Sequence, residues 1–154
     1  MTSIPENKRI AIIGGGTNTY ISNHLALSAP AYGSTAKKLA NKFRANPENQ
    51  MQVDLYLTHM AQQAPGNPDT PEEVESLVDK LVADPDTRVI IFNVAMVDYK
   101  PEVLSEEMFD NPEYTYNKEI TSNFGKYAGR LSTSKHPEIL LELSVQDKII
   151  QKIR

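Results

Sequence analysis

Residues 8–17 of the chain are Lys-Arg-Ile-Ala-Ile-Ile-Gly-Gly-Gly-Thr. Four consecutive apolar residues that stop at glycines predict a short strand that is buried on both faces, as in the middle of a parallel sheet. The glycines allow positive φ and a close approach to the backbone, whose N–H groups can then hold a phosphate. We therefore expect a nucleotide- or phosphate-binding turn directly after the strand, formed by Gly14, Gly15, Gly16 and Thr17. The alternative is a tight strand-to-helix turn that binds no ligand.

The spacing of the glycines matches neither of two common phosphate-binding motifs. A dinucleotide-binding Gly-x-Gly-x-x-Gly run that began at Gly14 would need glycine where the chain has Thr19, and one that began at Gly15 would need glycine where it has Thr17. A P-loop would need Gly-Lys-Ser/Thr, which does not follow the glycines. The predicted turn therefore belongs to neither motif.

Downstream, the apolar periodicity predicts alternating helices and strands. In order, we expect a helix over 33–45, a strand over 53–58, a helix that begins at Thr70, and a strand over 88–97. Thr70 and Glu73 form the pattern of a capping box, and Pro71 suits the first helical position. This β-α-β-α-β order predicts one α/β domain over 1–154, a Rossmann-like three-layer sandwich with a mainly parallel sheet.

The segment 100–129 breaks this alternation. It is rich in Glu, Asn, Tyr and Pro and has no clear period. Because it is long for a loop in a compact domain, we expect an extended arm, lid or hairpin there, and a homodimer through it. After it, the pattern predicts strands over 130–134 and 138–145 and a closing helix over 146–154.

Two further segments carry candidate binding residues. Ligands of parallel α/β sheets lie at the carboxyl ends of the strands. Residues 94–101, at the end of the predicted strand 88–97, are therefore candidates for ligand binding. Asp98 can accept hydrogen bonds from a ribose or a base, or alternatively cap the next turn. Arg130 can pair with a phosphate, or be an ordinary exposed arginine. The histidines match no metal-ligand spacing, so we expect no metal site there: His24, His59 and His136.

Composition narrows the classes of partner. The chain has 16 Lys and Arg against 20 Asp and Glu, a net charge of −4, and no basic run, which argues against a nucleic-acid or membrane partner. No window approaches the ~18 apolar residues of a membrane span. The absence of cysteine excludes disulfides, zinc–thiolate sites, iron–sulfur clusters and thiol catalysis. With no signal-peptide pattern, these features predict a cytoplasmic protein.

These segments, in this order, resemble the phosphopantothenate–cysteine ligase family, which is similar to the C-terminal domain of the DNA/pantothenate metabolism flavoproteins. Residues 15–17 match the family's Gly-Gly-Thr, and 20–24 match its aromatic-Ile-Ser/Thr-Asn stretch. Residues 94–99, Val-Ala-Met-Val-Asp-Tyr, match Ala-Ala-Val-Ala/Ser-Asp-Tyr/Phe, the most specific piece. Arg130 stands where the family has lysine. A second register aligns Gly33 with the family glycine and puts Ala29 at the asparagine position.

The resemblance implies a two-step ligase reaction in coenzyme A biosynthesis. The carboxylate of phosphopantothenate would attack the α-phosphate of CTP or ATP, with Mg²⁺, and the cysteine amine would then form the amide. Asn23 would hold the reacting acyl oxygen, and Arg130 would stabilise phosphate charge. The residues implied to bind nucleotide or substrate are Gly14, Gly15, Gly16, Thr17, Gly33, Ala95, Asp98 and Tyr99.

Two other hypotheses stay open. The family's Asp-Pro-Val-Arg stretch is missing and residues 25–31 look like an insertion, which favours a catalytically inactive nucleotide-binding or scaffold module of the same fold. An unrelated dinucleotide-binding Rossmann domain is disfavoured, because Thr58 and His59 stand where an acidic ribose ligand is expected.

Overall fold

The computed structural model describes residues 8–22, 24–104, 134 and 140–153. The chain divides into two compact units, which are described separately. The first unit comprises Met1–Thr17, Ala29–Met96 and Lys148–Arg154, and the second comprises Asn18–Ser28 and Val97–Asp147.

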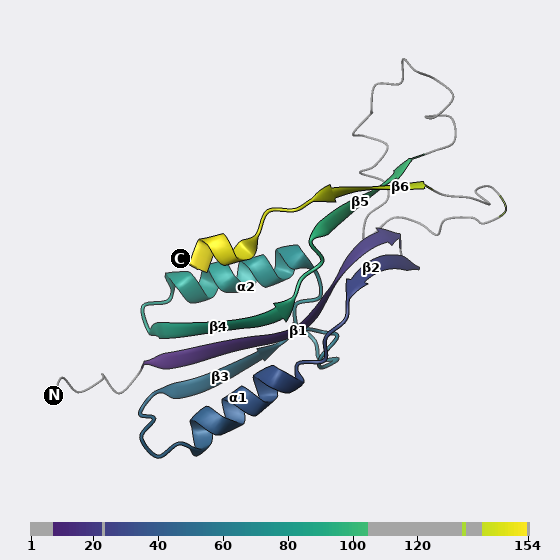
Figure 1. Cartoon of the computed structure of the whole chain (residues 1–154). Helices are drawn as coiled ribbons and strands as arrows, with labels where there is room; N and C mark the ends of the chain where they lie inside the picture. The colour runs from purple at the N-terminus through teal and green to yellow at the C-terminus, as the bar shows by residue number, and fades with distance from the viewer. Residues whose placement is uncertain (1–7, 23, 105–133, 135–139, 154) are drawn as a thin grey trace. The chain divides into compact units, whose positions relative to one another are not determined.

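Strand β1 (Arg9–Ser22), which belongs to the first unit as far as Thr17, is the central strand of its sheet (Figure 1). It pairs in parallel with β3 (Gln52–Leu57) on one side and with β4 (Thr87–Ala95) on the other. The register places Ile12 beside Leu55 of β3 and Ile91 of β4. The predicted parallel sheet is therefore confirmed, and its first strand lies between the other two.

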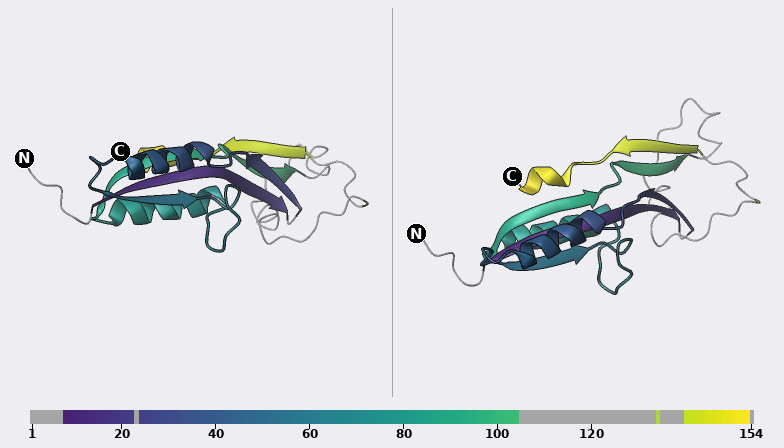
Figure 2. Two further views of the ribbon diagram at one scale, coloured as in Figure 1. Left: turned by 90° about the horizontal axis from the view of Figure 1, so that it is seen from below. Right: turned by 60° about the horizontal axis from the view of Figure 1, so that its bottom comes forward.

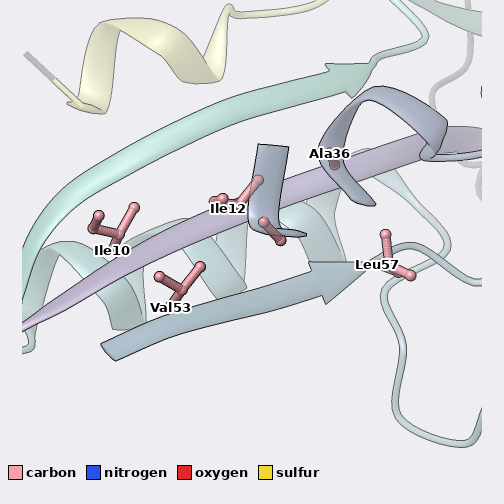
Figure 3. Close-up of a cluster of buried hydrophobic side chains, with 6 residues drawn as sticks. Ile10, Ile12, Ala36, Val53 and Leu57 are labelled. Carbon is pink, nitrogen blue, oxygen red and sulfur yellow. The ribbon is translucent and has the colours of Figure 1, made fainter. Parts of the chain in front are cut away.

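Alternate side chains of β1 face opposite layers, as expected for a strand buried on both sides. Ile10 and Ile12 point toward helix α1 (Ser34–Ala45). They share a buried cluster with residues of α1 and β3: Ala36, Ala40, Val53 and Leu57 (Figure 3).

Ala11 and Ile13 of β1 face the other way, toward helix α2 (Pro71–Ala83). Val74, Val78 and Leu81 of α2 complete this second cluster, together with Ile149. One helix thus covers each face of the sheet (Figure 2), and the Rossmann-like three-layer sandwich predicted from the sequence is confirmed.

Both helices begin where the sequence indicates. Gly33 is the N-cap of α1, with a left-handed φ of 69°. At α2, the Glu73 N–H donates to the Thr70 hydroxyl, and the Glu73 carboxylate accepts from the Thr70 N–H, at 3.3 Å each. This is the predicted capping box, with Pro71 as the first helical residue.

The strand β2 (Leu25–Ala29) was not predicted. It lies next to β1 in the sheet, and two residues separate it from the end of β1. Ser28 donates a hydrogen bond to Oδ1 of Asn18 at 2.6 Å. The segment that looked like an insertion is therefore a strand that pairs with β1, and the order is β-β-α-β-α-β in place of the expected β-α-β-α-β.

The second unit also contains a two-stranded antiparallel ribbon. Strand β5 (Tyr99–Leu104) pairs with β6 (Leu140–Val145), so the predicted arm begins as a strand and the predicted strand 138–145 is present over its described residues, 140–145. Ser134 lies in a turn, and the rest of the predicted strand 130–134 lies outside the described residues. In the first unit, the predicted closing helix is a short 3₁₀ helix, η2 (Ile149–Ile153). None of the helices in the described part of the chain has the length and apolarity needed to cross a membrane.

The capping box offers a test of the fold. Thr70→Ala removes the hydroxyl that accepts from the Glu73 N–H, and we expect it to lower the free energy of unfolding by about 1 kcal/mol. Urea unfolding followed by circular dichroism measures this change. Thr70→Ser keeps the acceptor and is the matched control, and equal losses in the two variants would contradict a capping role.

Candidate functional site

The glycine run lies inside strand β1 and does not form a turn. Pairing with β4 continues through all three glycines, which lie beside Asn93, Val94 and Ala95. Because the strand continues to Ser22, the backbone has no opportunity to turn at Gly14. The expected phosphate-binding turn and its alternative, a tight strand-to-helix turn, are therefore both wrong, and the dinucleotide hypothesis, which needs such a turn, loses support. Gly15 alone departs from regular strand geometry, with a φ of +123°.

The glycines allow other parts of the chain to approach the strand closely. A Cβ atom on Gly14 would overlap the side chain of Ala36 in α1. On Gly15 it would overlap the Thr58 hydroxyl, and on Gly16 the carbonyl oxygen of Ala29. Each glycine is thus required by packing within the first unit, whether or not a ligand binds.

The N-terminus of α1 lies at this end of the strand. A Cβ atom on its N-cap, Gly33, would lie 3.1 Å from Cβ of Ala61 and 3.8 Å from the carbonyl carbon of Gly14. No side chain caps this helix, and its first turn has no acidic residue. Ser34 and Thr35 are exposed there. The unpaired N–H groups and the helix dipole therefore make this end of α1 suited to an anion.

Lys37 adds a positive charge near the same helix end. Its Nζ donates to the carbonyl oxygen of Ala61 at 3.3 Å, which holds the ammonium group against the loop that follows β3. Helix α2 differs, because Glu72 and Glu73 already provide negative charge in its first turn. Of the two α-helices described, α1 is the one whose N-terminus remains electrostatically suited to an anionic ligand.

Thr58, the residue directly after β3, was missed as a site residue by the sequence analysis. Its N–H donates to the carbonyl oxygen of Gly14 at 3.0 Å, and its side chain is fully buried against Gly15. Among the described residues its Oγ1 has no hydrogen-bond partner. A buried hydroxyl without a partner costs about 1–3 kcal/mol. The feature of the sequence that could have identified Thr58 is a polar residue at the end of an apolar strand.

Thr17 and Ala95 are joined by a hydrogen bond. Thr17 is fully buried, and its Oγ1 donates to the Ala95 carbonyl oxygen at 3.2 Å. This bond joins β1 to β4 immediately after Gly16, the last glycine that pairs with β4. Two residues that the sequence analysis assigned to ligand binding are thus brought together in the first unit, along with Gly14, Gly15, Gly16 and Gly33.

The remaining predicted site residues belong to the second unit or lie outside the described residues. Asp98 and Tyr99 belong to the second unit, where the Asp98 carbonyl oxygen accepts from the Gln146 N–H at 2.9 Å and Tyr99 pairs with Val145. Asp98 is exposed, and Tyr99 is 47% exposed. Asn23 and Arg130 lie outside the described residues. Within the described ranges, no group of three His, Asp or Glu side chains could hold a metal ion.

A comparison with solved structures finds this fold in the DNA/pantothenate metabolism flavoprotein from Streptococcus pneumoniae. The match covers 95% of this chain and 63% of that chain, with a TM-score of 0.64 and 21% sequence identity. The chain thus spans less than two thirds of the flavoprotein's length. At this identity the likeness shows a shared fold, and it agrees with the resemblance that the sequence motifs indicated.

A second structure, a Cab2 mutant in complex with phosphopantothenate-cysteine, matches with a TM-score of 0.49 and 12% identity over 96% of this chain and 59% of that chain. This likeness is too weak to support an inference. No family model matches the sequence, and the search of curated proteins finds no match.

Packing at Gly15 can be tested against a glycine with a similar conformation in open space. Gly15→Ala puts a Cβ onto Thr58 at a positive φ, and we expect it to lower the free energy of unfolding by about 2–4 kcal/mol. Gly66 has a φ of +83°, and a Cβ added there would meet nothing within 4 Å, so Gly66→Ala is the matched control. We expect that variant to lose only about 1–2 kcal/mol through backbone strain.

Urea unfolding of the two variants beside the wild type measures the difference between steric overlap and backbone strain. Equal losses for Gly15→Ala and Gly66→Ala would contradict the close packing of Thr58 on the strand.

Proposed function

We propose that this chain binds a nucleoside triphosphate and acts as a phosphopantothenate–cysteine ligase-like protein of coenzyme A biosynthesis. The observation that carries the proposal is the uncapped N-terminus of α1, with Lys37 as its fourth residue, beside the glycine run of β1. Such a helix end favours the oxygens of a phosphate.

Two further observations support this choice among phosphate-binding functions. The fold is shared with a protein whose name places it in pantothenate metabolism. Independently, residues 15–17 and 94–99 carry the ligase-like motifs, and both stretches include the C-terminal end of the parallel pairing between β1 and β4. In parallel α/β sheets this end is where ligands bind.

The proposed reaction has two steps. An oxygen of the substrate carboxylate attacks the α-phosphorus of CTP or ATP, and pyrophosphate leaves, which gives an acyl nucleotide. The cysteine amine then attacks the acyl carbon, loses a proton, and releases the nucleoside monophosphate as the amide forms. Activation is needed because a free carboxylate is a poor electrophile, whereas an acyl phosphate has a good leaving group.

The chain's residues would serve the reaction mainly by binding and orienting the nucleotide. The N–H groups at the start of α1 and the Lys37 ammonium would hold phosphate oxygens, and the chain from Gly14 to Thr17 would shape the floor of the site. Asp98, Tyr99 and Ala95 would contact the nucleotide, as the resemblance implies. Asn23 would donate to the reacting acyl oxygen and Arg130 would stabilise phosphate charge.

Several finer parts of the proposal follow from the resemblance. Mg²⁺ would enter bound to the triphosphate, whose oxygens are the hard ligands it prefers. The chain would act in the cytoplasm and form a homodimer through the arm 100–129. Exposed apolar side chains on the β5–β6 ribbon support such an interface: Tyr99, Leu143 and Val145.

An inactive module of the same fold is the second candidate. It is favoured by the packing of Ala36, Thr58 and Ala29 on the three glycines, because this packing explains the glycine run without any catalysis. Such a module would bind nucleotide, or a protein partner, and would release no pyrophosphate.

Calorimetric titration with CTP, ATP and NAD, each with Mg²⁺, tests the nucleotide site. We expect saturable binding of CTP or ATP, and about a tenfold or greater loss of affinity in Asp98→Ala, because hydrogen bonds to the nucleotide are removed. Asp147→Ala changes an exposed aspartate of the same unit and is the matched control. Binding of NAD alone would contradict the proposal and revive the dinucleotide hypothesis.

Pyrophosphate release separates the ligase from the inactive module. We expect release that depends on phosphopantothenate, and amide formation that depends on added cysteine. Triphosphate binding without any pyrophosphate release would favour the inactive module, and the absence of triphosphate binding in folded protein would overturn both nucleotide-dependent functions.

A further inference from the structure

The Thr58 hydroxyl is a buried polar group that the fold leaves without a partner. The residue is fully buried, and Oγ1 makes no hydrogen bond within the described part of the chain. Its backbone, in contrast, is fully engaged. The N–H donates to the Gly14 carbonyl, and the Thr58 carbonyl accepts from the N–H groups of Ala61 and Gln62 at 3.0 Å each.

Valine has nearly the same shape as threonine, and it would fill this position without leaving a buried hydroxyl unpaired. A threonine here therefore needs an explanation other than packing. Buried donors without a partner in the free protein are expected where a ligand supplies the missing acceptor.

The surroundings of the Thr58 hydroxyl indicate the chemical class of ligand that would accept its hydrogen bond. Oγ1 lies against Gly15, and Gly15 and Gly33 both pack on Ala61. Ala61 also accepts the hydrogen bond from Lys37. The Thr58 hydroxyl, the uncapped start of α1 and the Lys37 ammonium are thus all connected through contacts with Ala61. Each of the three favours an anionic oxygen.

We propose that Thr58 donates its hydroxyl hydrogen bond to a phosphoryl oxygen of the triphosphate bound at the start of α1. This inference rests on the proposed function and adds Thr58 to the residues that contact the ligand. Because Thr58 is fully buried in the free protein, ligand binding must also open a path to Oγ1.

Thr58→Val tests the proposal, because it removes the donor and keeps the side-chain shape. We expect the affinity for CTP or ATP with Mg²⁺, measured by calorimetry, to fall about 10- to 100-fold, the effect of one hydrogen bond to a charged group. Thr58→Ser keeps the hydroxyl and should bind within about threefold of the wild type. The melting temperature of the free Thr58→Val protein should equal or exceed that of the wild type.

Two controls separate ligand contact from a structural effect. Thr87→Val removes a hydroxyl at the other end of the sheet, from the first residue of β4, and should leave affinity unchanged. Pyrophosphate should show the same loss in Thr58→Val as the triphosphate, because it presents the same phosphoryl oxygens without the base and ribose.

The wild type provides a measurement that does not depend on any variant folding. The Thr58 methyl resonance, assigned by its absence in Thr58→Ser, should shift on saturation with CTP or ATP and stay unchanged with the free nucleoside. Triphosphate binding by the wild type with no loss in Thr58→Val, or with no methyl shift, would overturn the role of Thr58 and leave the proposed function standing. Absence of triphosphate binding by the wild type would overturn both.

Discussion

The close contact between the backbone of β1 and the chain around it, at Gly14, Gly15 and Gly16, is the constraint on which the first unit depends. Side chains cannot be accommodated there, because Ala36, Thr58 and Ala29 occupy the space. This contact fixes where α1 starts and where the loop after β3 begins. It therefore also fixes the position of the helix end that we propose binds phosphate.

The two ends of the parallel strands differ in charge. At the N-terminal end, Arg9 lies between Asp54 and Asp84 at 3.6 and 3.5 Å, and Lys8 pairs with Asp86 at 2.9 Å. These cations already have carboxylate partners, so they offer little to a further anion. At the C-terminal end, the start of α1 and the Lys37 ammonium have carbonyl groups or solvent as neighbours. An anionic ligand is thus favoured at the C-terminal end on electrostatic grounds.

Local signals predicted the helices and their starts well, because a cap depends on residues three or four positions apart. Thr70, Glu73 and Gly33 all act as the sequence indicates. The extent of β1 was not predictable in this way. Glycine favours turns locally, and what keeps 14–16 extended is pairing with β4, about eighty residues away. For the same reason the segment 25–29 looked like an insertion, since its partner is the unexpected second half of β1.

The glycine run at 14–16 shows that a sequence motif does not by itself establish a ligand-binding role. The glycines were singled out because a ligand can approach a bare backbone, and the structure shows that other segments of the chain make that approach first. The residues that favour an anion are Lys37, the uncapped start of α1, and Thr58, none of which stands out in a motif. Their chemistry depends on burial and on missing partners, which are properties of the folded chain. A glycine run at this position therefore indicates close packing, and it indicates a ligand only together with an unsatisfied donor beside it.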